Sequence, residues 1–296
     1  MGNKMKKILA LLLISFSLSL SANQDESKSI DISAVSDLIT LVQANPALSA
    51  SILKERYIDK DAGGLAILGP RLTTPENLQS FISAIKEDNW SNIWRCASYL
   101  NDLDEKVASI KSKLTKLSNT SLSGVKVYGV VGAGNTAATA SPVGVVLGLE
   151  LICLEDAQKV SLKRTLEDYI THELVHVLQF RLTKRTNFNF NLLEISILEG
   201  SADYLAELIA GATYTLNDKR TEFGLGKKKQ LITDFKATML SSDFSPWLYS
   251  DIDSMPRDMG YWIGYQIAKA YIENGGSIVD LLSMDDAEAI LKKSGL

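Results

Sequence analysis

The two histidines of this 296-residue chain both lie in the five-residue segment His172-Glu173-Leu174-Val175-His176. Residues four positions apart lie on one face of an α-helix, about 40° apart around its axis, so a helix brings both imidazoles to the same side. Two imidazoles in this arrangement can bind a single Zn²⁺, and Glu173 is then placed to act as a general base. The segment therefore predicts a helix that carries part of a zinc site. The alternative is that both histidines are ordinary core residues.

The third protein ligand that zinc usually requires beside water cannot be a histidine here, so it has to be Asp, Glu or Cys. The segment Glu199-Gly200-Ser201-Ala202-Asp203 places two carboxylates four residues apart beside an apolar helical stripe. Like charges at this spacing repel, and burial adds a desolvation cost, so a nearby cation would offset both. We expect Glu199 to bind the metal and Asp203 to accept a hydrogen bond from a ligand imidazole. In the alternative, both carboxylates project into solvent.

These two segments together resemble the gluzincin clan of zinc metallopeptidases, in which a glutamate of an ExxxD segment on a following helix is the third ligand. More closely, the chain is similar to the predicted zinc-dependent proteases of bacteria. Those chains have a glycine-punctuated strand pair before the HExxH helix and a later helix rich in Tyr and Gly, matched here by residues 260–265. The similarity extends from about Val125 to the C-terminus. It implies the ligands His172, His176 and Glu199, with Asp203 behind them.

The resemblance also implies a reaction, the hydrolysis of a peptide bond in a peptide or protein by zinc-activated water, with Glu173 as the base. The chain departs from thermolysin-like members because it lacks the downstream histidine that stabilises the oxyanion. Tyr261, Tyr265 or Arg257 has to replace it. Tyr261 is favoured because it lies one turn into a helix expected from about Pro256 to Ile272. The alternative for Tyr261 is an aromatic side chain packed on the domain surface.

A function of another class fits the same residues. A catalytically silent, zinc-stabilised binding or interaction protein could keep a peptidase-like fold and its metal ligands. Activity of the wild type that is lost in Glu173→Gln would distinguish the enzyme from the binding protein.

The predicted fold is α+β: a mainly helical, zincin-like domain with a small antiparallel sheet beside the HExxH helix. Residues 23–123 are expected to form a helical N-terminal region, and residues 124–296 the metallopeptidase domain. Helix starts are expected at Thr74-Pro75, at Ser161, and at Asn191, whose spacing to Glu194 predicts a capping box. The β-rich runs 125–131 and 143–153 predict the strands, with the outer edge within Val143–Leu151 available to an extended peptide.

A competing motif lies between these runs. Gly132-Ala133-Gly134-Asn135-Thr136-Ala137 fits the start of a dinucleotide-binding fingerprint, with Glu150 at a suitable distance. That fingerprint needs a helix directly after the glycines, whereas Ser141-Pro142 and a β-rich run follow here. A hairpin turn is therefore the better interpretation.

The N-terminus has the pattern of a secretory signal over residues 1–22. Three lysines precede an apolar run that is too short and too rich in serine to anchor a chain stably in a membrane. Its removal leaves 28 basic against 35 acidic residues, a net charge of −7, which argues against nucleic acid as a partner. We expect a periplasmic or secreted protein. Cys96 and Cys153 could form a disulfide there or remain as buried thiols, and the oligomeric state is not defined by the sequence.

Overall fold

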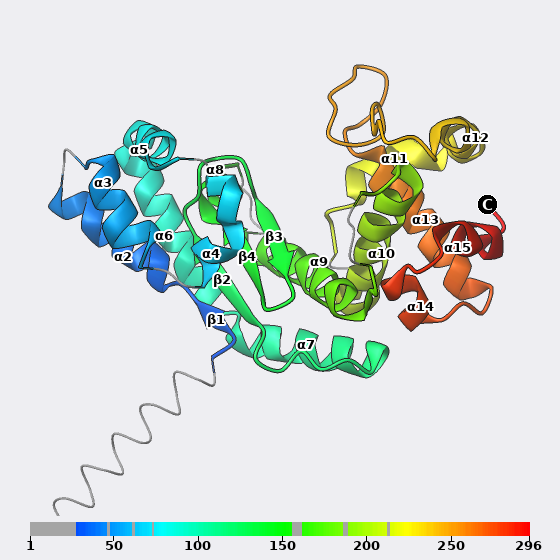
Figure 1. Ribbon diagram of the computed structural model, residues 1–296, viewed down its shortest axis with the longest axis horizontal. Coiled ribbons are helices and arrows are strands. Elements are labelled where there is room, and N and C mark those ends of the chain that lie inside the picture. Colours follow the sequence, from blue (N-terminus) through cyan, green and yellow to red (C-terminus); the bar gives the residue numbers. More distant parts are fainter. Residues whose placement is uncertain are drawn as a thin grey trace, which may run out of the picture.

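The computed structural model describes residues 28–296 except 46–47, 61–62, 73, 156–161, 186–188 and 212–213. The expected signal segment 1–22 and the expected helix cap Ser161 lie outside the described residues. The fold is α+β, as predicted, with two groups of helices and one sheet (Figure 1). No helix in the described part of the chain is both long and apolar enough to cross a membrane.

Most of the N-terminal helices lie on one side of the molecule, and the last of them, α7, packs against the HExxH helix near the middle of the molecule (Figure 1). They are α2 (Ser33–Ala44), α3 (Ala50–Leu53), α4 (Gly64–Leu68), α5 (Pro75–Ala84), α6 (Glu87–Asn101) and α7 (Asp104–Ser118), with a π-helical turn at Lys54–Ile58 and a 3₁₀ turn at Gly69–Leu72. The predicted start of α5 is confirmed, because the Asn77 N–H donates to Thr74 Oγ1 over 3.3 Å and Pro75 is the first helical residue. The short helix α8 (Leu149–Glu155) packs on α6, and a disulfide joins Cys96 to Cys153.

The sheet has four strands in the order β1-β2-β4-β3. They are β1 (Ile30–Asp31), β2 (Lys126–Val130), β3 (Ala138–Ser141) and β4 (Gly144–Gly148). The prediction of an antiparallel sheet was wrong for most of it, because β1 and β4 both run parallel to β2 and only the β3–β4 pair is antiparallel. The reason is that a third strand, β3, a short run of Ala, Thr and Ser, lies between the two apolar runs in the sequence. Strand β3 turns back into β4 and pairs antiparallel with it, so β4 runs in the same direction as β2.

The predicted sheet edge within Val143–Leu151 is also corrected. Strand β4 lies between β2 and β3, all five of its residues are buried, and the chain becomes helical from Leu149. An uninterrupted apolar run is typical of an interior strand with parallel pairing, whereas an edge strand tolerates polar residues. The edge on the side of the HExxH helix is β3.

The glycine-containing loop 132–137 leads from β2 directly into β3, without a helix, so the dinucleotide fingerprint is not completed. The loop is not a hairpin turn either, because β2 pairs with β4 rather than β3. Glu150, buried at the start of α8, accepts a hydrogen bond from the Gly134 N–H over 3.2 Å. Burial raises the pKa of Glu150. The carboxyl group therefore ties the loop to the end of β4.

The C-terminal helices form the other side of the molecule (Figure 1). They are α9 (Leu162–Leu182), α10 (Leu192–Ala210), α11 (Asp218–Leu225), α12 (Lys228–Thr238), α13 (Met259–Glu273), α14 (Ile278–Ser283) and α15 (Ala287–Ser294). One core contains the sheet, the N-terminal helices and α9, and it includes side chains from both sides of position 123. A second core contains α10, α12, α13 and α15. Helices α9 and α10, which carry the predicted site, lie where the cores meet.

Candidate metal centre

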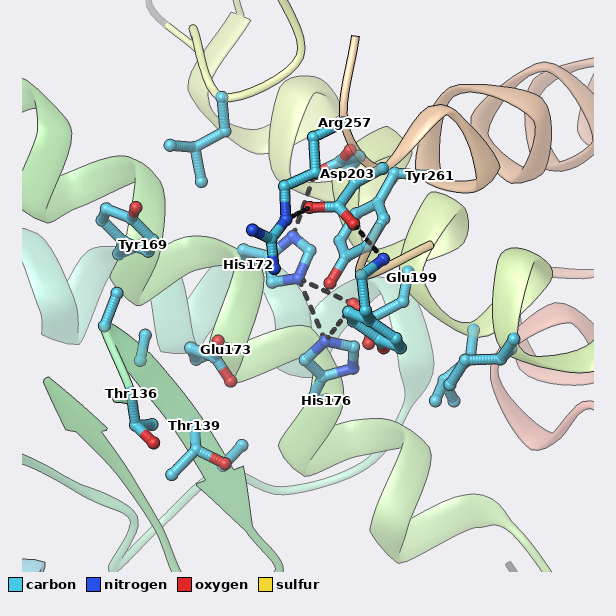
Figure 2. A pocket seen from close by; sticks show the side chains of 18 of the residues that line it. Thr136, Thr139, Tyr169, His172, Glu173, His176, Glu199, Asp203, Arg257 and Tyr261 are labelled. Carbon is cyan, nitrogen blue, oxygen red and sulfur yellow. Dashed lines mark hydrogen bonds and ion pairs between the residues drawn. The ribbon is translucent and has the colours of Figure 1, made fainter. Parts of the chain in front are cut away.

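The three predicted zinc ligands converge at one point between α9 and α10 (Figure 2). His172 Nε2 lies 3.0 Å from His176 Nε2, and Glu199 Oε2 lies 3.3 Å and 3.1 Å from these two atoms. With metal–ligand bonds of about 2.0–2.1 Å, the ligand atoms of a tetrahedral zinc site lie about 3.3 Å apart. The triangle of donor atoms therefore fits one face of a tetrahedral zinc site.

Helix α10 begins in a way that fixes the position of Glu199. The predicted capping box is confirmed: the Glu194 N–H donates to Asn191 Oδ1 over 2.9 Å, and the Asn191 N–H donates to Glu194 Oε2 over 2.8 Å. A capped start sets the rotation of the helix, because both terminal N–H groups are bonded to named side chains. Glu199 then faces α9 one turn before Asp203.

Each imidazole is held by a hydrogen bond at Nδ1, the ring nitrogen that does not face the other predicted ligands. His172 Nδ1–H donates to Asp203 Oδ1 over 3.0 Å, as predicted for Asp203. His176 Nδ1–H donates to Gln179 Oε1 over 2.5 Å, and the Gln179 amide donates in turn to Leu198 O and Ser201 Oγ. A proton on Nδ1 leaves the Nε2 lone pair free for a metal. Both imidazoles are therefore orientated as metal ligands.

Asp203 is the centre of a buried network that the sequence did not predict. Its side chain is fully buried, and it accepts from Tyr214 O–H over 2.5 Å and from Arg220 Nη2 over 3.1 Å, in addition to His172. The segment that carries Tyr214 is fixed to α9, because Thr215 donates two hydrogen bonds to Asp168 Oδ2. Arg220 brings the positive charge that a buried carboxylate requires. The network holds Asp203 rigidly behind His172.

The electrostatics of the centre favour positive charge. Burial alone would lower the pKa of His172, but hydrogen bonds to the carboxylates of Asp203 and Glu199 outweigh it and raise this pKa to about 10. Burial would raise the pKa of Glu199, but the neighbouring imidazoles hold it well below its usual range. Two carboxylates beside two imidazoles therefore stabilise a cation, whether a proton or a metal ion.

Glu173 lies beside the ligands at the wall of a cleft of about 1110 Å³ (Figure 2). In Figure 2 its carboxyl group is on the side of the histidines that faces Thr136 and Thr139. Thr139 belongs to β3, so the sheet edge borders the cleft on the same side as Glu173. Burial raises the pKa of Glu173, although the two imidazoles act against this. The predicted base is thus placed between the ligands and the sheet edge.

Tyr261 also lines the cleft and lies next to His172 (Figure 2). Its ring stacks on that imidazole with centroids 6.1 Å apart, and the Arg220 guanidinium lies 4.7 Å from its ring centroid. Burial raises the pKa of Tyr261 well above its usual value, so the phenol remains protonated and can donate a hydrogen bond. Tyr249, which the sequence did not single out, lines the same wall and hydrogen-bonds to the Tyr261 side chain.

The other two candidates for the oxyanion role have different surroundings. Tyr265 does not line the cleft; it is buried on another face of α13, where it hydrogen-bonds to Glu207 and packs edge-on against Tyr204. Arg257 lines the cleft, but its side chain is half exposed and pairs with Asp251 at 3.3 Å and Asp258 at 3.5 Å. Of the three, Tyr261 is the one that stacks on the side chain of a predicted ligand, His172.

Two glycines bring α13 close enough to place Tyr261. A Cβ atom on Gly264 would lie 1.6 Å from Ser196 O, and one on Gly200 would lie 2.0 Å from Tyr265 N. Any side chain at either position would force α10 and α13 apart. Gly264 and Gly200 therefore permit the close approach of α13 to α10.

Comparison with known proteins adds one finding. A family model described as "Predicted Zn-dependent protease (DUF2268)" matches residues 136–292, more than half of the chain. The chain belongs to this family. The match contains β3 and every side chain of the centre described above, whereas α2–α7 precede it. No curated protein and no solved structure matches the chain.

Proposed function

We propose that this protein is an exported zinc metallopeptidase of the gluzincin type, with His172, His176 and Glu199 as the metal ligands. The observation that carries the proposal is the convergence of three ligand atoms within 3.3 Å of one another, with both imidazoles orientated through Nδ1. The family's description as a predicted zinc-dependent protease supports it.

Glu173 is the proposed general base. When bound, Zn²⁺ would supply a Lewis acid that polarises a carbonyl group and lowers the pKa of water towards ~7. Glu173 accepts a proton from the attacking water and delivers it to the leaving amine. Because burial raises its pKa, this carboxyl group holds the proton more readily between the two steps than an exposed glutamate would.

Tyr261 is the proposed oxyanion donor. Its protonated phenol lies beside His172 in the cleft wall, and its ring is fixed between that imidazole and Arg220. A preorganised donor of this kind requires little rearrangement when negative charge develops on the substrate oxygen.

Strand β3 is the proposed binding edge for the substrate backbone. It is the outermost strand of the sheet, it borders the cleft, and no described strand pairs with its outer side. A peptide that adds to this edge gains main-chain hydrogen bonds that do not depend on its side chains. The proposed substrates are therefore extended segments of peptides or unfolded proteins.

The proposal of export to the periplasm or medium rests on the lysine-flanked apolar segment at the N-terminus. The Cys96–Cys153 disulfide is compatible with an oxidising compartment. N-terminal sequencing of protein recovered from the periplasm or medium tests it: export predicts a mature chain that begins near residue 23, and an uncleaved cytoplasmic chain contradicts it.

Metal analysis and one isosteric variant test the central proposal. Purified wild type should contain about one equivalent of zinc, and His176→Ala or Glu199→Ala should lose it. Glu173→Gln should keep the zinc but lose most turnover on a broad peptide library. If wild type and Glu173→Gln retain zinc and are equally inert, a zinc-stabilised binding protein becomes the better account.

A further inference from the structure

A second cavity opens beside the metal centre. It has a volume of about 210 Å³ and shares the side chains of His176, Phe180 and Leu198 with the main cleft. His176 is a proposed metal ligand, Leu198 directly precedes Glu199, and Phe180 lies one turn after His176 on α9. The cavity therefore borders the cleft beside the proposed metal ligands, close to where a scissile bond would lie.

The walls of this cavity are apolar. They are formed by Phe180, Phe190, Leu198, Leu282 and Met284, which come from the end of α9, from α10 and the residue before its cap, and from the end of α14. An engineered cavity of about 150 Å³ lined by similar residues binds benzene. A cavity of about 210 Å³ can therefore hold a leucine, methionine or phenylalanine side chain.

The charged group at the cavity does not favour an acidic side chain. Arg185 lines the cavity, but its guanidinium forms an ion pair with Glu194 and lies 5.2 Å from the centroid of the Phe190 ring. The neighbouring carboxylate thus offsets the positive charge before any substrate enters, and only Arg185 Nη1 is left without a hydrogen-bond partner among the described residues. A carboxylate on the ligand would compete with Glu194 and would lose its hydration among the apolar walls.

We propose that this cavity is the main specificity pocket of the enzyme and takes a bulky apolar side chain of the substrate, on a residue flanking the scissile bond. The inference rests on the proposed peptidase function and adds the substrate class: extended peptides with Leu, Met or Phe beside the cleaved bond. Backbone pairing with β3 would supply affinity without selectivity, and this pocket would supply the selectivity.

Cleavage-site profiling on a mixed peptide library tests the proposal. Wild type should enrich Leu, Met or Phe at one of the two positions flanking the cleaved bond, with kcat/KM at least ~10-fold higher than for alanine there, because even one methylene in a fitted pocket contributes about 10-fold or more. Ser283→Phe, which fills the cavity from α14, should reduce the leucine-to-alanine ratio of kcat/KM towards one. Val279→Phe is the matched control, because Val279 lies exposed on the same helix outside the cavity.

A binding measurement separates this proposal from the peptidase function. In zinc-loaded Glu173→Gln, which should not cleave, a leucine peptide should bind at least ~10-fold more tightly than its alanine counterpart, and Ser283→Phe should abolish the difference. Thr183→Phe fills the cavity from the residue that follows α9 and replaces Ser283→Phe if that variant does not fold. The pocket proposal is overturned by equal binding of both peptides, by a preference for Asp or Glu, or by an apolar preference that both filling variants leave unchanged. These outcomes hold whether or not the wild type cleaves peptides.

Discussion

Replacing Asp203 by asparagine should weaken zinc binding while leaving every ligand in place. Asp203 accepts from His172 Nδ1–H, Tyr214 O–H and Arg220 Nη2. An asparagine oxygen can still accept from His172 and Tyr214, but its NH₂ group would face the donor of Arg220, and the negative charge beside His172 is lost. Loss of such a supporting carboxylate typically weakens metal binding ~10–100-fold, which corresponds to about 1.4–2.7 kcal/mol.

Competition titration against a zinc chelator measures this change. Asp168→Asn is the matched control, because Asp168 is also buried on α9 but bonds to Thr215 rather than to a ligand. Its zinc affinity should remain close to wild type. The free energy of unfolding of Asp203→Asn in EDTA should also be lower than that of wild type, because Arg220 is left without its buried charged partner. Zinc affinity of Asp203→Asn within twofold of wild type would refute the assigned role of Asp203.

Three further results are expected. Tyr261→Phe should keep zinc and lower kcat ~10²-fold, whereas Tyr265→Phe, outside the cleft, should keep wild-type kcat; equal kcat in both variants would remove Tyr261 from the mechanism. Gly264→Ala should lower the free energy of unfolding by about 1–3 kcal/mol or more in denaturant titrations, because its Cβ would collide with a backbone carbonyl of α10. Gly226→Ala is the control and should be tolerated, because the space around its Cβ is open and its φ is −80°. Burial raises the pKa of Asp168 from 3.8 to about 6, so the folded state holds this proton more tightly than the unfolded state. Wild type should therefore lose stability as pH rises from about 4 to about 6, and a pH series in which Asp168→Asn shows the same decline would contradict this.

The parts of the fold and site that the sequence predicted are those that depend on short spacings. The HExxH and ExxxD segments have their functional side chains one helical turn apart, so helix geometry alone places them on one face. The caps at Thr74 and Asn191 are equally local, since each involves residues three positions apart. Gln179 could have been found in the same way, because it lies three residues after His176 on the same helix.

The parts that the sequence did not predict depend on contacts between distant segments. Tyr214 and Arg220 reach Asp203 from the loop after α10 and from α11, and neither belongs to a motif that indicates a partner. The direction of pairing in the sheet was missed for a related reason. The apolar residues of β4 indicate a strand, but β3 has no apolar residue larger than alanine and gives only a weak strand signal in the sequence.

Because the centre lies between the two cores, a bound metal would affect the packing of the helices as well as the chemistry of the site. Both histidines come from α9, whose apolar face belongs to the first core, whereas α10 contributes Leu193 and Ile197 to the second core and Ala202 and Leu205 to the first. A metal held by His172, His176 and Glu199 would therefore link α9 to α10 where the two cores meet. Because a ligand that binds only the folded state stabilises it in proportion to the logarithm of its concentration over Kd, metal binding and the packing of α9 against α10 support each other. The same contact fixes the walls of the cleft and of the apolar cavity, so the proposed catalysis and the proposed substrate selection would both depend on it.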